Sequence, residues 1–197
     1  MAAVATGRPR EFDIDRALDR ALEVFRRNGY DGASIADLTE AMGINPPSLY
    51  AAFGNKEALF RKALDRYIEQ LDYWNEALAK PTAREMVEHL LYSTADFMTN
   101  DCRPRGCMFV RGVLSCGEST EAIRAELEAR RNAAEVALRE RFERAQASGE
   151  VKCDCDPGDA ARYILTVLEG ITLRATTGAS REELHKVAEM AMRNWPD

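Results

Sequence analysis

Five side chains between residues 34 and 56 are of types that bind phosphate, and each lies at or near a predicted helix start: Ser34, Asn45, Ser48, Tyr50 and Lys56. The first backbone amides of a helix and the positive end of its dipole favour negatively charged oxygens. These groups therefore predict docking onto a phosphate backbone. The alternative is an ordinary structural role for each, because Ser and Asn cap helices in most proteins and a Lys is often only solvated.

The elements that would position these side chains are two short helices joined by a tight turn. Ser34, with Asp37 three residues later, has the pattern of a capping box, and Gly43 is suited to end that helix. Asn45 is suited to cap the next helix, which starts with two prolines and ends by Gly54. This spacing is typical of a helix-turn-helix that places its second helix in the DNA major groove, although helical hairpins in bundles share it.

The predicted second helix holds no Arg or Lys between Asn45 and Phe53. Bidentate hydrogen bonding to guanine, the commonest specific contact in the major groove, is therefore not expected from it. We expect specificity to come partly from apolar contacts with thymine methyl groups and from DNA shape.

The whole string from residue 29 to residue 60, GYDGASIADLTEAMGINPPSLYAAFGNKEALF, resembles the N-terminal domain of the tetracycline-repressor (TetR) family. The resemblance covers residues 12–65 in register, and the remainder agrees in helical architecture and length. It implies that the first three helices bind DNA, that a fourth connects, and that the rest binds a ligand and forms a homodimer. The implied function is a transcriptional regulator, most simply a repressor released from its operator by a small-molecule effector. The sequence does not decide between repressor and activator.

Position by position, the resemblance implies distinct roles within residues 34–56. Phosphate contacts would come from Ser34, Tyr50 and Lys56, and Ser48 takes the place of a usual Thr. The residues that would face the base edges are Pro46, Pro47 and Ala51, whereas Leu49 and Phe53 would pack inward. The departures from frequent residues are Asn45 for Ser, Pro47 for Gly and Ala52 for His, so no operator sequence is inferred.

The charge of the chain is divided unevenly. Residues 1–66 hold ten Lys and Arg against ten Asp and Glu, so residues 67–197 carry the whole net charge of −6. A neutral N-terminal part can present a basic face to DNA, whereas an acidic remainder would be repelled. Arg8 and Arg10 lie in what we predict to be a flexible arm, which would enter a narrow minor groove or simply remain solvated.

Apolar residues recur at helical spacing along the chain, and they predict an all-α protein. The predicted organisation is a flexible basic arm over 1–11, a helix-turn-helix DNA-binding domain over 12–54, one connecting helix over 55–80, and an effector-binding and dimerisation domain over 81–197. The apolar run 106–117 is assigned to a helix because no partner strand is found elsewhere. No apolar run is long enough to span a membrane and no secretory signal is found, so we expect a cytoplasmic protein.

The last domain would need a pocket for the effector. Most aromatic and Met residues there should be plain core, and we expect roughly a third of the candidates to contact an effector. Arg111 is the polar candidate, for an acidic ligand or for an internal salt bridge. The candidates are Tyr73, Trp74, Tyr92, Phe97, Met108, Phe109, Arg111, Leu114, Cys116 and Tyr163.

Five cysteines, an odd number in a chain without a secretory signal, are expected to be free thiols: Cys102, Cys107, Cys116, Cys153 and Cys155. Cys107 is either a buried inert thiol or a sensor of oxidants or electrophiles, as in a few members of the family. A thiol enzyme using Cys107 or Cys116 with His89 is a further alternative, against which stands the lack of a nucleophile elbow or phosphate loop. Cys153 and Cys155 fall short of a closed metal site, and we predict no metal and no cofactor.

Residues 157–176 and 181–194 each form a predicted helix with an apolar stripe, and Gly170 would permit close approach of a second helix. Two such helices per subunit form a four-helix interface in the family that the chain resembles. A two-fold dimer would bind a palindromic operator. The predicted interface residues are Ile164, Val167, Leu168, Gly170, Ile171, Leu184, Val187, Ala188, Ala191 and Trp195.

Overall fold

The computed structural model describes residues 12–100, 106–110, 121–151 and 155–195, and these residues form helices without any strand. The all-α prediction is therefore confirmed for the described part of the chain. The helices are α1 (Ile14–Gly32), α2 (Ile35–Met42), α3 (Pro46–Phe53), α4 (Lys56–Glu69), α5 (Asp72–Leu78), α6 (Ala83–Met98), α8 (Glu121–Ala147), α9 (Pro157–Thr176) and α10 (Arg181–Arg193). Met108–Val110 are helical, and the remainder of the predicted helix 106–117 beyond Val110 lies outside the described residues.

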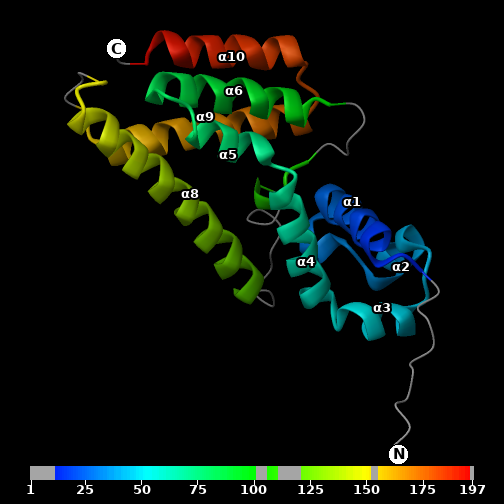
Figure 1. Cartoon of the computed structure of the whole chain (residues 1–197). Coiled ribbons are helices and arrows are strands. Elements are labelled where there is room, and N and C mark those ends of the chain that lie inside the picture. The colour runs from blue at the N-terminus through cyan, green and yellow to red at the C-terminus, as the bar shows by residue number, and fades with distance from the viewer. Residues whose placement is uncertain (1–11, 101–105, 111–120, 152–154, 196–197) are drawn as a thin grey trace, which may run out of the picture.

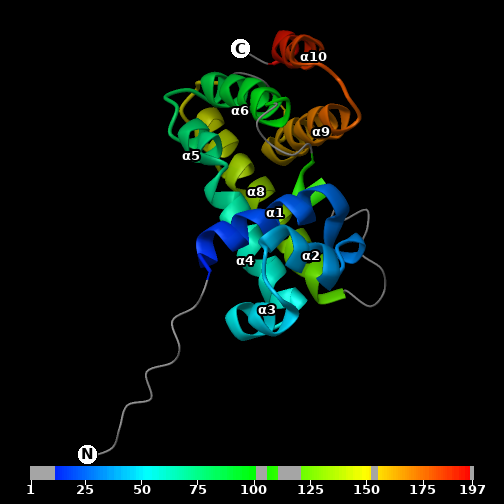
Figure 2. The same cartoon turned by 90° about the vertical axis from the view of Figure 1, so that its right-hand side faces the viewer.

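Helices α1 to α3 pack into a small unit at one end of the molecule, with α9 and α10 at the other end (Figures 1 and 2). Its core is formed by fully buried residues from each helix, among them Phe25, Leu38 and Leu49. Phe60 at the start of α4 joins this core, because its ring meets Phe25 edge-on at 5.0 Å between centroids. The predicted caps are present: Ser34 and Asp37 form a reciprocal capping box.

One expectation about helix boundaries was wrong. The first helix is interrupted at Gly29, which has φ 72° and ψ −177°, and the last turn of α1 runs from there to Gly32. The predicted connecting helix over 55–80 is broken into α4 and α5 at Gln70 and Leu71. The N–H groups of Gln70 and Leu71 reach back only three residues, which tightens the last turn of α4. No Gly or Pro lies between residues 67 and 78 to signal this break.

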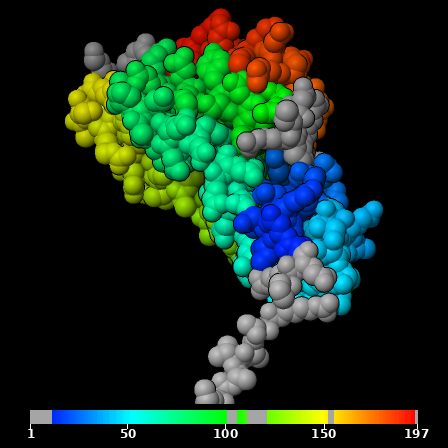
Figure 3. Space-filling view, turned by 45° about the vertical axis from the view of Figure 1, so that its right-hand side comes forward, coloured from blue at the N-terminus to red at the C-terminus, as the bar shows by residue number. Residues whose placement is uncertain are grey.

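The body is built around α6, which packs against α5 on one side and against α9 and α10 on the others. α8 packs along α9 and then diverges from the body towards the middle of α4 (Figure 1). Space-filling representation shows the N-terminal unit, blue to cyan, and the body, green to red, as two parts with α4 between them (Figure 3). None of the described helices is long and apolar enough to cross a membrane.

Arg26 of α1 is buried where the N-terminal unit meets the body. Its Nε donates a hydrogen bond of 3.0 Å to the carbonyl of Gly106. Its guanidinium carbon lies 5.4 Å from the ring centroid of Tyr67 and 5.7 Å from that of Phe97. A buried cation needs such partners, since an uncompensated charge away from water is costly. This contact attaches the first helix to the body.

The expectation of free thiols is wrong at one position. Cys107 is free and buried, whereas Cys155 is disulfide-bonded. A disulfide depends on the distance and direction between two Cβ atoms, which spacing along the chain does not reveal.

Gly43 provides a test of the turn between α2 and α3. We expect Gly43→Ala to lower the free energy of unfolding by about 1 kcal/mol, because Gly43 has φ 68° and L-residues are strained in this left-handed region. Gly32→Ala is the control, since its added Cβ would lie 3.5 Å from the Cβ of Asn28 in ordinary contact. Urea unfolding followed by circular dichroism measures both. Equal losses in the two variants would contradict the role of Gly43.

Candidate nucleic-acid interface and internal cavity

α3 presents an uncharged face to solvent. Asn45, Pro46, Pro47, Tyr50 and Ala51 are exposed, and Ser48 is half-buried. Leu49 and Phe53 are buried on the opposite side, as the resemblance implied. The residues predicted to meet DNA thus share one accessible surface, with Tyr50 49% exposed at its centre. Contact between these residues and DNA stays a prediction.

The start of α3 differs from a usual anion site. Pro46 and Pro47 carry no N–H, and the N–H of Ser48 donates to Oδ1 of Asn45 at 2.9 Å. The first three residues of α3 therefore present no unpaired backbone N–H to a phosphate. Because Oδ1 of Asn45 must face the Ser48 N–H, the Nδ2 amino group is left as the donor that this cap directs outward. Asn45 is thus both a cap and the candidate hydrogen-bond donor of this face.

Ser34 is engaged more completely than the sequence suggested. Its hydroxyl donates to Oδ2 of Asp37 at 2.7 Å, and its backbone N–H donates to the same oxygen at 2.9 Å. These two hydrogen bonds lower the pKa of Asp37, with that from the hydroxyl contributing most, so the carboxylate stays ionised. Ser34 thus caps and positions α2. Contact of its side chain with a phosphate stays a prediction.

Lys56, at the first position of α4, lies against the aromatic cluster of the N-terminal unit. Its Nζ is 4.5 Å from the ring centroid of Tyr30, a cation–π distance. Burial lowers the pKa of Lys56, and the nearby Asp31 opposes this shift. Tyr30 thus holds the ammonium group near the start of α4.

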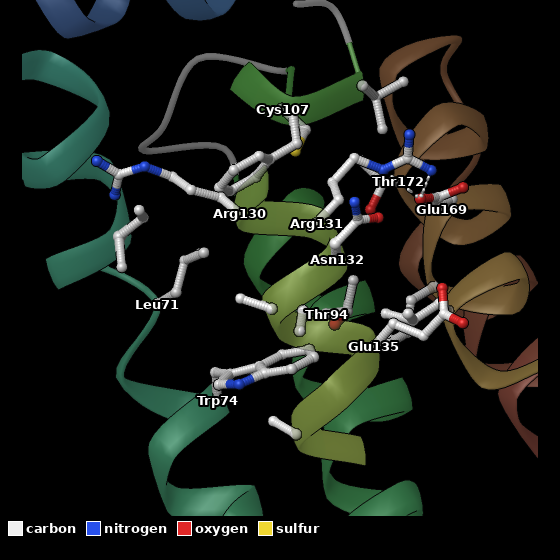
Figure 4. Close-up of a pocket in the computed structure, with 18 of the residues that line it drawn as sticks. Leu71, Trp74, Thr94, Cys107, Arg130, Arg131, Asn132, Glu135, Glu169 and Thr172 are labelled. Carbon is white, nitrogen blue, oxygen red and sulfur yellow. Dashed lines mark hydrogen bonds and ion pairs between the residues drawn. The ribbon is translucent and has the colours of Figure 1, made fainter. Parts of the chain in front are cut away.

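A cavity of about 650 Å³ lies in the body between α4, α5, α6, α8 and α9. Three of the ten predicted effector contacts line it, namely Tyr73, Trp74 and Phe109, and their contact with an effector stays a prediction. In Figure 4, Leu71 and Trp74 lie on one side of this cavity, Glu169 and Thr172 lie towards the other, and Cys107 enters at its upper end.

The remaining predicted effector contacts lie elsewhere. Tyr92 packs edge-on against the His185 ring at 5.0 Å, and Phe97 lies between Arg26 and the Tyr73 ring rather than in the cavity wall. Met108 is buried core, and Tyr163 is 45% exposed. Arg111, Leu114 and Cys116 lie outside the described residues, as do Arg8 and Arg10 of the predicted arm.

Sequence reasoning missed several cavity residues because they carry no signal of their own. Tyr67 was assigned to the inner stripe of the connecting helix, and Thr94, Arg130 and Glu135 lie in helices without a motif. The packing of α4, α6 and α8 around one cavity brings them together.

Charged side chains at the edge of the cavity are paired between helices. Arg131 of α8 bonds to Glu169 of α9, and Arg162 of α9 lies 3.3 Å from Glu135 of α8. The dashed contact in Figure 4 marks the first of these ion pairs.

On the side of α4, four residues form what we call the α4–α8 clasp: Arg61, Asp65, Glu126 and Arg130. Arg61 Nε lies 2.7 Å from Glu126, and Arg130 lies 2.7 Å from Asp65 and 3.1 Å from Glu126. Burial would raise the pKa of Glu126, but hydrogen bonds from Arg61 and Arg130 lower it. Arg130 also lines the cavity, so one guanidinium belongs both to the clasp and to the cavity edge.

The predicted dimer residues divide into two groups. Seven of them are buried within the single chain and contribute to its own core, and a role for them in a dimer interface stays a prediction: Ile164, Leu168, Ile171, Leu184, Ala188, Ala191 and Trp195. Helical periodicity identifies an apolar stripe but not which molecule covers it. Val187 and Gly170 are exposed and Val167 is half-buried. On α9 and α10, the large apolar side chains that are exposed but were not predicted to lie in the interface are Tyr163, Leu173 and Met190.

Comparison with known proteins agrees with this geometry. Residues 17–63 match the family described as bacterial regulatory proteins, tetR family, and residues 83–191 match the tetracyclin repressor-like C-terminal domain. The transcriptional repressor ComR of Escherichia coli K12 is 34% identical over 97% of this chain and 92% of its own. The repressor BdcR of the same strain is 31% identical over 94% and 90%.

The fold is also found in solved structures. A cysteine mutant of the TetR family transcriptional regulator CifR, solved with 26-bp double-strand operator DNA, is 46% identical. It superimposes with a TM-score of 0.91 over 96% of this chain and 100% of that one. A TetR regulator from Rhodococcus sp. RHA1 is 41% identical, with a TM-score of 0.64 over 93% and 99%. The two matched regions correspond to the helix-turn-helix and to the helical body, and ComR and BdcR match along nearly the whole chain. The chain belongs to the TetR family of bacterial regulatory proteins.

Proposed function

We propose that this protein is a repressor that binds a palindromic operator as a homodimer and is released when a small molecule occupies the cavity of the body. The observation that carries the proposal is the placement of α4. This helix starts beside the DNA-binding surface at Lys56 and ends in the cavity wall at Tyr67 and Ile68. A ligand that moves one end of a rigid helix also moves the other. The operator complex of CifR, a regulator of the same fold, supports the DNA-binding part of this proposal.

The α4–α8 clasp offers a second route between cavity and DNA. Its side chains are partly exposed, and ion pairs of this kind contribute little to stability. They can therefore open at small cost when a ligand displaces α8. Such an opening would leave α4 free to tilt and would alter the spacing between the two α3 helices of a dimer.

DNA contact is proposed for the exposed face of α3. Pro46, Pro47 and Ala51 would meet thymine methyl groups, Asn45 would donate from Nδ2, and Tyr50 and Lys56 would contact phosphates. The face holds no cation that could read guanine, so shape and deformability of the operator would contribute to recognition.

A cysteine-based sensor is the second candidate, because Cys107 is free and lines the cavity. A repressor whose release requires this thiol would lose its response in Cys107→Ser, whereas a repressor that binds its effector reversibly would keep it. The thiol-enzyme alternative is not supported. His89 is not among the residues that line the cavity with Cys107, so no thiol–imidazole pair is assembled there.

The DNA-binding proposal is tested by selecting operators from a random duplex pool and measuring affinity by fluorescence anisotropy. We expect binding well above that of an unrelated duplex, with an affinity that falls steeply as salt rises, because phosphate contacts release counterions. Equal affinity for selected and unrelated DNA would reject operator recognition.

Asn45 allows its roles as cap and as DNA contact to be separated. We expect Asn45→Asp to keep the melting temperature, because Asp caps a helix as well as Asn does. It should weaken operator binding by about tenfold or more, since two donors are lost and a negative charge is placed near phosphates. Asn45→Ser is the control, because Ser can cap and still donate from its hydroxyl. Unchanged affinity in Asn45→Asp would exclude a DNA contact at this position.

The dimer is tested on the exposed apolar residues of α9 and α10. Met190, 64% exposed, belongs to this face, and we expect Met190→Glu to shift the protein from dimer to monomer in sedimentation analysis. Val136→Glu on α8 is the matched control, because Val136 is 40% exposed and lies on a helix outside the proposed interface. A Met190→Glu protein that stays dimeric at low micromolar concentration would contradict this interface.

A further inference from the structure

The wall of the cavity contains a polar atom that the protein itself leaves unsatisfied. Tyr67 of α4 is completely buried and lines the cavity, and its hydroxyl has no hydrogen-bond partner among the described residues. The groups that act on this hydroxyl electrostatically include Cys107 and Tyr73, which line the same cavity, so the hydroxyl end of the ring is the end near it. A buried polar group without a partner is costly and rare in folded proteins.

The Tyr67 hydroxyl keeps its proton at neutral pH and can therefore donate a hydrogen bond. Burial, followed by the nearby Cys107 thiol, raises the pKa of Tyr67 well above its usual value. The thiol is only a weak hydrogen-bonding group and does not satisfy a phenol. The positive charge of Arg26, whose guanidinium lies 5.4 Å from the ring centroid, slightly opposes this rise in the pKa of Tyr67.

The charged groups of the described wall are already paired, and a hydroxyl in it has a neighbouring hydroxyl. The Tyr73 hydroxyl lies 3.5 Å from the Thr94 hydroxyl. Arg130, Arg131 and Arg162 pair with Asp65, Glu169 and Glu135 at the edge. An ionised ligand would lose its water and would have to break one of these ion pairs to gain a counter-ion. An uncharged ligand avoids this cost.

The rest of the wall is apolar and partly aromatic. Ile68, Leu71, Trp74, Met98 and Phe109 line the cavity. Such a surface favours a hydrophobic or aromatic body, with one polar group to fix its orientation.

We propose that the cavity binds an uncharged molecule with an aromatic or otherwise apolar body and a hydrogen-bond-accepting oxygen, such as an aromatic ketone, which accepts from the Tyr67 hydroxyl. This inference rests on the proposed function in taking the cavity as the effector site. Binding at Tyr67 would also act on the contact between the two parts of the protein. The same ring packs against Arg26 of α1, and Arg26 bonds to Gly106, the residue before Cys107 in the wall.

The test uses three naphthalene probes of nearly equal size: 2-acetylnaphthalene, 2-isopropenylnaphthalene and 2-naphthoate. The ketone and the alkene differ mainly in the accepting oxygen, and the carboxylate adds a charge. Dissociation constants are measured by isothermal titration calorimetry on the full chain. We expect the ketone to bind about fivefold more tightly than the alkene, as one net hydrogen bond predicts, and the carboxylate to bind most weakly.

Tyr67→Phe should remove the preference for the ketone while leaving the melting temperature unchanged or higher, because it deletes an unsatisfied buried hydroxyl. Tyr73→Phe is the matched control, since its hydroxyl faces Thr94, and it should retain the preference. Tightest binding of the carboxylate, binding of none of the probes, or a ketone preference that persists in Tyr67→Phe would each overturn the proposal.

A parallel anisotropy titration with selected operator DNA separates this inference from the proposed function. Release of DNA by the ketone in the wild type and not in Tyr67→Phe supports both. If the ketone binds with its Tyr67-dependent preference and DNA affinity does not change, the ligand class stands and the effector role of the cavity is overturned.

Discussion

One buried cation determines how the DNA-binding unit lies on the body. Arg26 is only 2% exposed, and its charge is compensated by the Gly106 carbonyl and by the faces of two aromatic rings. A guanidinium taken out of water cannot leave such partners without a large penalty. The first helix, the start of the segment that enters the cavity wall and the ring of Tyr67 are therefore held together. A displacement of any one of these three would therefore shift the packing of the other two.

The division of charge along the chain matches this arrangement. The DNA-binding unit is neutral and its recognition helix is uncharged, whereas the acidic residues are concentrated in the body. Repulsion between the body and DNA would favour an orientation in which only the α3 end approaches the duplex. The two prolines at the start of α3 add rigidity there, because their φ angles are fixed before folding. If α3 contacts the operator as proposed, recognition would depend on shape and apolar fit more than on ionic contacts.

The cavity and the ion pairs around it have different physical roles. Its described wall is largely apolar and contains the unsatisfied Tyr67 hydroxyl, and under the proposed function this combination would select a ligand. Its edge is closed by ion pairs between α8 and its neighbours, which are weak because they are partly exposed. Under the proposed function, an apolar interior with weakly paired charges at its edge would let a ligand enter and shift α8 without unfolding the body.

The sequence by itself determined the local features of this protein. Capping residues such as Ser34 and Asn45, helix ends such as Gly43, and the spacing of Leu49 and Phe53 are encoded within a few residues of where they act. The helix-turn-helix and the all-α fold were predicted for that reason. The tertiary structure decided which apolar stripe was covered by the chain itself, so that Ile164 and Leu184 proved to be core and Met190 remained exposed. It also decided the break after α4 and the meeting of Tyr67, Cys107 and Arg130 in one cavity. These features depend on contacts between helices far apart in sequence, and periodicity records only that a face is apolar, not what it meets.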